Sequence, residues 1–384
     1  MKKLIILLML FAVNGFLFSQ TSWQSALVSV DNSGKIMYHA DKDGFYIPDF
    51  SHAGYKGGGV DLPAVATMKT ISPVLGDNTR NIQDALDFVG SLPKDENGIR
   101  GALLLTAGKY DIYGTIYVKY DGVVLRGVGQ EDNVATSTIL YARGNTPTQR
   151  DVVVLGYPST QINGKTQISG TTSNITDDLV PIGAFSFNVD NSSLYKVGDR
   201  IIIYHPCTQA WIEAVNRGGV PYPDTSAPTD PDERWVAGQL PIVYNRFIIG
   251  ISGNTITVDA PVFYTLKKTI SSCYIYKPNV NNLVSQVGLE NLRIDIETLG
   301  SDDENHAWEA ARFKSCENSW AQNCTFIHFG HSGIITEACT RSTFVSCSAI
   351  DPVATRLQKE NHERPLCEVQ ASDRHEPALR EFQQ

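Results

Sequence analysis

The stretch CENSWAQNCTFIHFGHSGIITEACTRSTFVSCSAI, residues 316–350, decides the fold because it repeats itself after 23 residues. Cys316 and Cys339 are 23 positions apart, and Cys324 and Cys347 are separated by the same number. A fixed period of this size is typical of a solenoid, a chain that winds into stacked coils. Equivalent residues of successive coils are then expected to stack at the usual strand separation of ~4.8 Å.

The sequence around the cysteines follows the same series. The segments ENLRI (290–294), QNCTF (322–326) and VSCSA (345–349) occupy equivalent places, although the first step of the series is nine residues longer than the second. The extra length matches the polar segment LGSDDENHAW (299–308), which we expect to bulge as a loop from one coil. The series predicts β-helix coils over residues 281–355.

The cysteines themselves favour thiols over disulfides. Cysteines in an exported protein usually indicate disulfides, but the count of seven is odd and the density is low. Small apolar thiols also pack well inside a stacked coil. Disulfides remain the alternative.

The N-terminus has the pattern of a secretory signal peptide. Two lysines precede an apolar run over residues 4–18, and we expect cleavage between Ser19 and Gln20. The run of ~15 residues is shorter than the ~20 that a membrane-spanning helix needs. The sequence therefore predicts a secreted protein, extracellular or periplasmic, with residues 1–19 as its signal and no membrane span after signal removal. An uncleaved anchor is the alternative.

The overall charge bears on the partner. The formal net charge is −9, and nucleic-acid binding needs clustered Lys and Arg to contact phosphates. We therefore expect no nucleic acid as a partner. Recognition of an acidic polysaccharide would need a local basic cleft.

Residues 76–150 are predicted to form a short N-terminal capping helix and the first β-helix coils. Apolar residues recur at helical spacing over DNTRNIQDALDFVGSLP (77–93). Short strands separated by glycine turns follow at residues 102–105, 115–118 and 123–126. Such strands suit stacked parallel coils.

Three other regions differ in character. Residues 151–280 contain longer alternating strands, and ISGNTITVD (251–259) predicts a hairpin, so we expect an antiparallel β insertion there. Residues 20–75 are predicted to be an irregular N-terminal segment. Residues 356–384 are rich in charge and interrupted by prolines, which predicts a polar, disordered tail.

Two parts of the chain resemble a known family. DNTRNIQDALD (77–87) followed by RGALLLTAGKYDIYGTIYVKYDGVVLRGVGQ (100–130) resembles the start of the β-helix in the pectate-lyase superfamily. IPDFSHAGYKGGG (47–59) and DDENHAWEAARFKSCENSWAQNCTFIHFGHSG (302–333) are similar to one branch of its large secreted proteins. The resemblance covers about half of the mature chain and implies an all-β fold, a right-handed parallel β-helix (solenoid).

The resemblance also implies a departure from that branch. Its coils continue past the element that matches Asp351 and Pro352, and an Arg-rich stretch follows soon after. Residues 356–384 do not match this continuation, so the resemblance implies a truncated C-terminal side. The superfamily contains lyases, hydrolases and proteins without catalysis, and fold alone does not choose among them.

One loop concentrates chemistry-bearing residues. It contains Asp302, Asp303, Glu304, His306 and Trp308. We select Asp303, Glu304 and His306 as catalytic candidates, and Trp308 as a substrate-binding residue that could stack on a sugar. The alternative is a solvated acidic loop with structural hydrogen bonds.

His328 and His331 complete the catalytic set, because one 23-residue coil would bring them near the face of the loop. A lyase acting on a uronate needs a group that neutralises the carboxylate, a base and an acid. A glycosidase needs two carboxylates roughly 5–9.5 Å apart. The selected residues could supply either set.

Asp302, Asp303 and Glu304 could also bind Ca²⁺, which takes carboxylate and carbonyl oxygens in irregular loops. Their spacing differs from that of an EF-hand loop. A zinc site built from the nearby histidines is a weaker hypothesis, because no pair has the i, i+4 helical spacing.

Two further tryptophans are candidates for substrate binding. Trp211 and Trp235 lie beside or within a long loop rich in Pro and Asp. Exposed aromatic rings stack on sugar faces, so this loop could be a glycan platform. The alternative is that both rings anchor the loop to the insertion.

These features predict a secreted carbohydrate-active protein that acts on an extracellular acidic polysaccharide. We expect a polysaccharide lyase, with a glycoside hydrolase as the alternative enzyme. The same features would also suit a non-catalytic glycan-binding or surface-attachment protein, or an incomplete and inactive family member. The sugar, the linkage, the metal requirement and the oligomeric state are left open.

Overall fold

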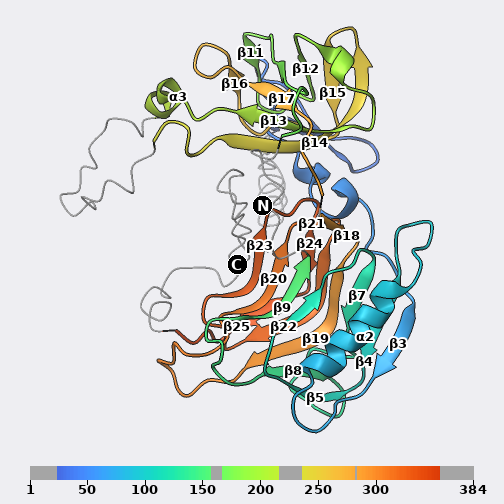
Figure 1. Ribbon diagram of the computed structural model, residues 1–384. Coiled ribbons are helices and arrows are strands. Elements are labelled where there is room, and N and C mark those ends of the chain that lie inside the picture. Colours follow the sequence, from blue (N-terminus) through green and yellow to red (C-terminus); the bar gives the residue numbers. More distant parts are fainter. Residues whose placement is uncertain (1–23, 157–166, 216–235, 282, 355–384) are drawn as a thin grey trace, which may run out of the picture.

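The computed structural model describes residues 24–156, 167–215, 236–281 and 283–354. Its body is a parallel β-helix, and an antiparallel module is inserted between two of its coils (Figure 1). The predicted fold class, an all-β parallel solenoid with an insertion, is confirmed. The predicted signal peptide and polar tail lie outside the described residues.

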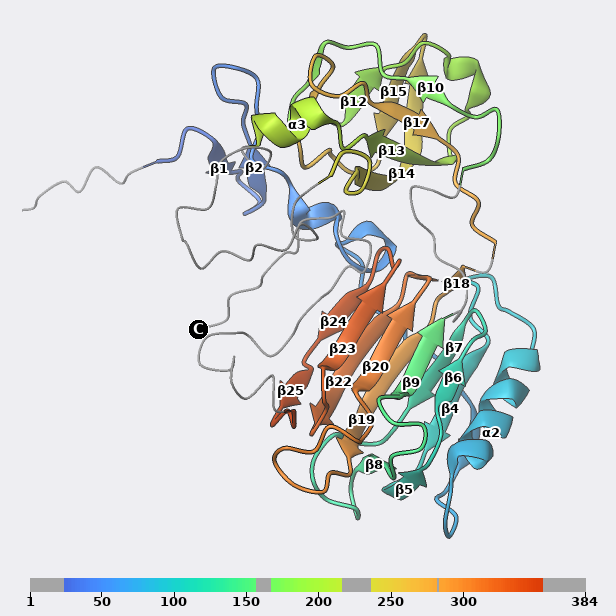
Figure 2. The ribbon, with the colours of Figure 1, turned by 60° about the vertical axis from the view of Figure 1, so that its left-hand side comes forward.

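The coils of the β-helix place their strands on three faces. In chain order the strands are β3 (Thr67–Ile71), β4 (Gly101–Leu105), β5 (Gly108–Ile112), β6 (Ile116–Val118), β7 (Val123–Arg126), β8 (Thr138–Ala142), β9 (Asp151–Gly156), β18 (Val284–Ser285), β19 (Gly288–Ile296), β20 (Glu309–Lys314), β21 (Cys316–Glu317), β22 (Trp320–Ile327), β23 (Ser332–Glu337), β24 (Thr343–Val345) and β25 (Ser348–Ile350). The first face contains β3, β4, β7, β24 and the first halves of β19 and β22. The second contains β5, β8, β25 and the second halves of β19 and β22. The third contains β6, β9, β20 and β23, which lie side by side in Figure 2. The two short strands β18 and β21 form a separate parallel pair.

The strand register confirms the 23-residue repeat. On the third face Glu309 pairs with Ser332, and on the second face Thr325 pairs with Ser348. The corner between the first two faces repeats too: Asn291 and Asn323 have left-handed φ values of 54° and 52°. Asn323 Nδ2 donates to Asn291 Oδ1 at 3.0 Å. Asparagine tolerates this backbone conformation better than most residues, so it suits the corner of each coil.

The stacked cysteines are thiols, as predicted. Cys316, Cys324, Cys339 and Cys347 are all free, and the register sets Cys324 beside Cys347. Burial raises the pKa of the Cys316 and Cys324 thiols well above the ordinary value. A buried thiol with a raised pKa acts as a small apolar side chain rather than as a nucleophile.

The predicted capping helix is α2 (Thr79–Ser91), which contacts β3, β4, β6 and β7. It buries an apolar stripe made of Ile82, Ala85, Leu86 and Val89. These side chains join the interior of the β-helix, where Phe313 and Phe326 also lie. The helix therefore covers the first coil and removes its apolar end from water.

The inserted module has an antiparallel sheet and a core of its own. Its elements are β10 (Ser173–Asn174), β11 (Leu179–Val180), β12 (Ser186–Asn188), η3 (Ser192–Leu194), β13 (Arg200–His205), α3 (Gln209–Ala214), β14 (Ile242–Ser252), β15 (Thr255–Val258), β16 (Leu266–Lys267) and β17 (Tyr274–Tyr276). Ile201, Ile203, Tyr244 and Ile256 are buried in its core. The predicted hairpin is present as β14 and β15.

The predicted start of the insertion at residue 151 is wrong. Strand β9 pairs in parallel with β6 and β20, so it belongs to the β-helix. Val152, Val153 and Leu155 are buried in the β-helix core. A continuous apolar run is typical of a parallel strand that is covered on both sides, and the module therefore begins after Gly156.

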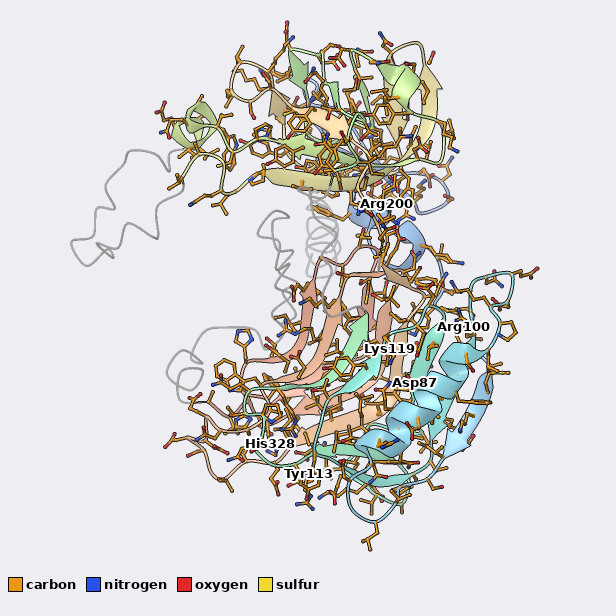
Figure 3. All side chains as sticks on the ribbon, viewed as in Figure 1. Asp87, Arg100, Tyr113, Lys119, Arg200 and His328 are labelled. Carbon is orange, nitrogen blue, oxygen red and sulfur yellow. The ribbon has the colours of Figure 1, made fainter. Side chains whose placement is uncertain are left out.

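Ion pairs and ring contacts join the module to the β-helix. Arg200, labelled at this junction in Figure 3, forms an ion pair with Glu317. Arg341 of the β-helix forms a second pair with Asp259 of the module. Both guanidinium groups lie over the ring of Phe247, at 4.7 and 4.1 Å from its centroid. Stacked cations over one ring favour a fixed arrangement of the two parts.

The N-terminal segment crosses the same junction. Its elements are β1 (Val28–Val30), β2 (Ile36–Tyr38), η1 (Phe50–His52) and η2 (Tyr55–Gly57). Phe50 stacks on Phe263 of the module at 5.0 Å, and Tyr55 packs against Trp320 of the β-helix at 5.4 Å. The segment predicted to be irregular thus contains short regular elements, and it contacts both the module and the β-helix. None of the described helices has the length and apolar character needed to cross a membrane.

Candidate functional site

The outer surface of the third face has charged side chains that the inner surface lacks. In β20, Phe313 points into the core, whereas Arg312 and Lys314 are partly exposed on the other side. Alternation of this kind follows from the two-residue period of a strand. Arg312 is in register with Val154 of β9 and Ile335 of β23, so it lies in the middle of this sheet.

Five charged residues form what we call the Arg312 cluster: Asp151, Glu309, Arg312, Lys314 and Glu337. Arg312 Nε lies 3.1 and 3.0 Å from the two oxygens of Asp151. Its Nη2 and Nη1 atoms lie 3.4 Å from Glu309 Oε1 and Glu337 Oε2. Lys314 Nζ is 3.2 Å from Glu337 Oε1. Three carboxylates, from β9, β20 and β23, therefore surround two cationic side chains of β20.

An aromatic pair adjoins this cluster. The Trp308 and His331 rings are stacked, with centroids 5.9 Å apart and planes inclined by 9°. His331 Nδ1 lies 2.8 Å from Glu309 Oε1 and 3.1 Å from Ser332 Oγ. Two of the predicted site residues, Trp308 and His331, are thus brought together beside three carboxylates.

Two buried polar atoms of the site have no hydrogen-bond partner among the described residues. They are Glu309 Oε2 and Trp308 Nε1. Glu309 is only 4% exposed. An unsatisfied buried polar atom costs ~1–3 kcal/mol, and such atoms are unusual enough to indicate a water or a ligand. One is an acceptor and the other a donor, a combination that a sugar hydroxyl can satisfy.

The environment also changes the acidity of one carboxyl group. Burial raises the pKa of Asp151 above its ordinary value, Arg312 opposes this rise, and the negative charge of Glu309 adds to it. A carboxyl group with a raised pKa keeps its proton closer to neutral pH, as a general acid must.

His306 does not lie in an exposed loop as predicted. It is 1% exposed, and its Nδ1 and Nε2 atoms lie 2.6 and 2.8 Å from the carbonyl oxygens of Ala307 and Val353. The ring therefore ties the loop to the last described coil. Because both ring nitrogens face backbone carbonyl groups, neither is open to a substrate, which corrects the expectation of an accessible catalytic His306.

His328 and His331 do not share one face, which corrects another prediction. His328 Nδ1 lies 2.9 Å from Asp295 Oδ1, in the second-face half of β19. Its position near the end of the strands is labelled in Figure 3. His331 instead contacts Glu309 on the third face. The turn between β22 and β23 directs the two rings to different sheets.

The acidic loop does not form the predicted calcium site. Although burial raises the pKa of Asp303, backbone N–H groups of Leu299 and Asn305, both at 2.9 Å from its oxygens, outweigh this and lower it. Asp303 therefore stabilises its own turn. Among the described residues, no group of three His, Cys, Asp or Glu side chains could hold a metal ion, and this includes Asp302, Asp303 and Glu304.

Trp211 is an anchor and not a surface platform, contrary to the prediction. It lies in α3, is 6% exposed, and donates through Nε1 to the Tyr264 hydroxyl at 2.9 Å. Its ring also meets the ring of His205 edge-on. Trp235 lies outside the described residues.

Sequence reasoning missed Asp151, Glu309, Arg312, Lys314 and Glu337. A usable signal for Arg312 and Lys314 was the alternation in ARFK over 311–314, where charged and apolar residues take opposite sides of one strand. No such signal marks Asp151. It lies before the inserted module in the sequence, whereas its partner Arg312 lies after the module.

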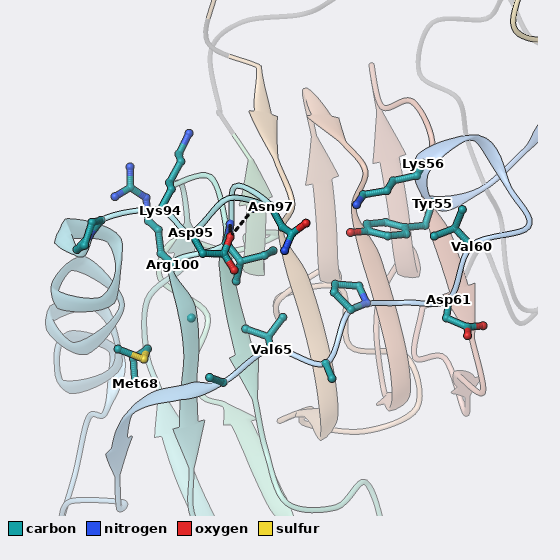
Figure 4. A pocket seen from close by; sticks show the side chains of 16 residues that line it. Tyr55, Lys56, Val60, Asp61, Val65, Met68, Lys94, Asp95, Asn97 and Arg100 are labelled. Atoms are coloured by element: carbon teal, nitrogen blue, oxygen red, sulfur yellow. Dashed lines mark hydrogen bonds between the residues drawn. The ribbon is translucent and has the colours of Figure 1, made fainter.

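A hollow elsewhere on the molecule is a weaker candidate. A pocket of about 680 Å³ lies between the N-terminal segment and the turn after α2 (Figure 4). Two of its polar groups have partners: Lys94 pairs with Asp121, and the Tyr55 hydroxyl donates to Gln286 at 2.6 Å. We therefore place the candidate site at the Arg312 cluster and the adjoining Trp308, where two buried atoms lack partners among the described residues.

Comparison with known proteins finds only distant structural likenesses. No protein-family model matches the sequence, and the search of curated proteins finds no relative. The tailspike protein of Pseudomonas phage LKA1 has a TM-score of 0.38 and 12% identity, covering 71% of this chain and 36% of that chain. The tailspike of Acinetobacter baumannii bacteriophage AP22, solved with a capsular saccharide, has a TM-score of 0.31 and 10% identity, covering 72% and 44%. A glycoside hydrolase has a TM-score of 0.22 and 10% identity, covering 71% and 67%.

The chain therefore spans less than half the length of these two tailspikes. TM-scores this low carry no argument about function. The fold instead rests on the strand register, and the resemblance to the pectate-lyase superfamily stays a prediction.

Proposed function

We propose that this chain is a secreted carbohydrate-active protein whose Arg312 cluster, with Trp308 and His331, contacts a glycan. The observation that carries the proposal is the Glu309 carboxylate. One oxygen contacts His331 and Arg312, while the other is buried without a partner among the described residues. A sugar hydroxyl would donate to that oxygen, and the Trp308 ring would offer an apolar surface beside it.

The reaction that this geometry supports best is hydrolysis of a glycosidic bond. Asp151 and Glu309 both contact the guanidinium of Arg312, so they are close enough for the separations of roughly 5–9.5 Å that glycosidases use. Asp151, with its raised pKa, would donate a proton to the leaving oxygen. Glu309 would act as the base or nucleophile on the other side of the bond.

The lyase alternative has less support. A lyase needs a cation to neutralise the uronate carboxylate, but Arg312 and Lys314 are already paired with carboxylates of the cluster. A protein that binds glycan without cleaving it is the second candidate. The ion pairs of Arg312 favour it, because they hold the surface in one arrangement and so reduce the ordering cost of binding.

The test is to incubate the protein with neutral and acidic polysaccharides and to measure new reducing ends and ultraviolet absorbance. We expect reducing ends without an unsaturated product. Glu309→Gln should reduce their release by roughly 100-fold or more, the order expected for loss of a general acid or base. Glu297→Gln is a matched control, because Glu297 pairs with Arg143 on the second face.

Three further outcomes decide against parts of this proposal. An unsaturated, ultraviolet-absorbing product would show a lyase instead. Retention on a polysaccharide column without any product would show the non-catalytic binder. Full activity of Glu309→Gln would move the site away from the Arg312 cluster.

A further inference from the structure

We infer that the Arg312 cluster accepts sugar units without a negative charge, uncharged or bearing an amino group, and rejects uronates. This inference rests on the proposed function, whose site it uses, and adds the substrate class. It differs from the expectation of an acidic glycan. Three properties of the site support it: its charges, its unsatisfied atoms and the contacts available to a ligand.

The cations of the cluster are already paired. Its three carboxylates, Asp151, Glu309 and Glu337, face two cations, Arg312 and Lys314. All three guanidinium nitrogens of Arg312 have carboxylate partners, since Nε contacts Asp151, Nη1 contacts Glu337 and Nη2 contacts Glu309. A uronate carboxylate would therefore have to displace an existing ion pair or lie among like charges.

The unsatisfied atoms favour a ligand that can donate. Glu309 Oε2 is a buried acceptor without a donor among the described residues, and Trp308 Nε1 is a buried donor without an acceptor there. A hydroxyl or an acetamido group can supply both roles, and an amino group can supply the donor. An ionised carboxylate is acceptor-only, so it could satisfy the indole but not Glu309.

The ring of His331 connects the two side chains that carry these atoms. It stacks on Trp308 and contacts Glu309 Oε1. The donor and the acceptor therefore belong to neighbouring side chains, which a single sugar unit could contact. Trp308 is itself half-buried, so part of its surface remains open to such a unit.

The experiment compares ligands that differ only in charge. Affinities would be measured by calorimetry for oligogalacturonides and for the same oligomers after methyl esterification, with cello- and chitosan oligosaccharides beside them. We expect the uncharged or amino-bearing oligomers to bind at least roughly tenfold more tightly than the free acid, because like charges in a binding site are strongly unfavourable. This comparison uses the wild-type protein, so it does not depend on the folding of any variant.

A charge variant then tests whether the cluster is the cause. Glu337→Gln leaves Lys314 and one edge of Arg312 without a carboxylate partner. We expect this variant to lower the ratio of the affinity for the ester to the affinity for the free acid by roughly tenfold. Glu297→Gln should leave this ratio unchanged.

Two failures are distinguishable. If the free-acid oligomer binds more tightly than its ester and Arg312→Met abolishes that binding, the charge inference is overturned while the proposed site stands. If no oligosaccharide of the set binds, the proposed function fails, and the substrate class falls with it.

Discussion

His331 Nδ1 lies 2.8 Å from Glu309 Oε1, and this contact joins the aromatic pair to the charged cluster. The ring of His331 is held on its other side by Trp308. Glu309 is therefore fixed through one oxygen while its second oxygen stays without a partner among the described residues. A side chain that is positioned before the ligand arrives loses little entropy on binding. Glycan affinity should therefore depend on both rings and on the carboxylate that joins them to the cluster.

Replacing His331 should weaken glycan binding without unfolding the protein. His331→Ala removes both the contact to Glu309 and the stacking partner of Trp308. We expect roughly tenfold weaker affinity, which corresponds to ~1.4 kcal/mol. The measurement is calorimetric titration with the best oligosaccharide. His328→Ala is the control, because His328 contacts Asp295 on the second face. Equal losses for both variants would contradict the assignment of the site to the third face.

Gly330→Ala should displace the Trp308 ring and so weaken glycan binding. A Cβ atom at this position would lie 2.8 Å from Trp308 Cδ1 and 3.0 Å from His306 Cε1. The two rings must move, and overpacking of this kind typically costs ~1–3 kcal/mol of unfolding free energy. The midpoint temperature of thermal unfolding and the ligand affinity should therefore both decrease. Gly250→Ala is the matched control, since its nearest atoms, in Thr257, are at ordinary contact distance. Lower stability with unchanged affinity would show that Trp308 does not contribute to ligand binding.

The acidity of Asp151 should respond to its neighbours in opposite directions. Glu309→Gln removes a like charge, so the pKa of Asp151 should fall, whereas Arg312→Met removes the opposing cation and should raise it further. Carbon NMR of the Asp151 carboxyl group against pH measures both shifts. Because the folded-state pKa of Asp151 is raised, its protonated form favours the native state, and this contribution is lost as pH rises through that pKa. Shifts of the same sign in both variants would disprove the assigned causes.

Much of the β-helix could be predicted because its pattern is local. The distance from Cys324 to Cys347 is one coil, and the register of Thr325 with Ser348 follows from it directly. The helix over 79–91 and the hairpin of β14 and β15 are equally local, since apolar spacing and turn residues within one segment determine them.

The candidate site could be predicted only in part, because its residues meet across coils. Trp308 and His331 are one coil apart, and sequence spacing indicated their approach. Asp151 and Arg312 contact each other across 161 positions of sequence, since the whole inserted module lies between β9 and β20. The polar segment around His306 predicted an exposed ring. The ring is buried instead, and its Nε2 atom contacts the carbonyl oxygen of Val353 on a later coil. Contacts of this kind depend on tertiary structure, which composition and periodicity do not describe.

His205 should make the inserted module sensitive to acid. It is 1% exposed, its Nδ1 has no partner among the described residues, and burial lowers its pKa from 6.5 to about 4. Between these two pH values the unfolded chain binds a proton that the native state does not, so stability falls as pH decreases through this window. The full effect is about 3 kcal/mol at 1.36 kcal/mol per pKa unit. Chemical denaturation at pH 7 and pH 4 should show this loss in the wild type, and His205→Leu should lack that part of it. His39→Leu, at an exposed position, should keep the wild-type dependence. If His205→Leu keeps the full acid sensitivity, His205 does not titrate as a buried neutral imidazole.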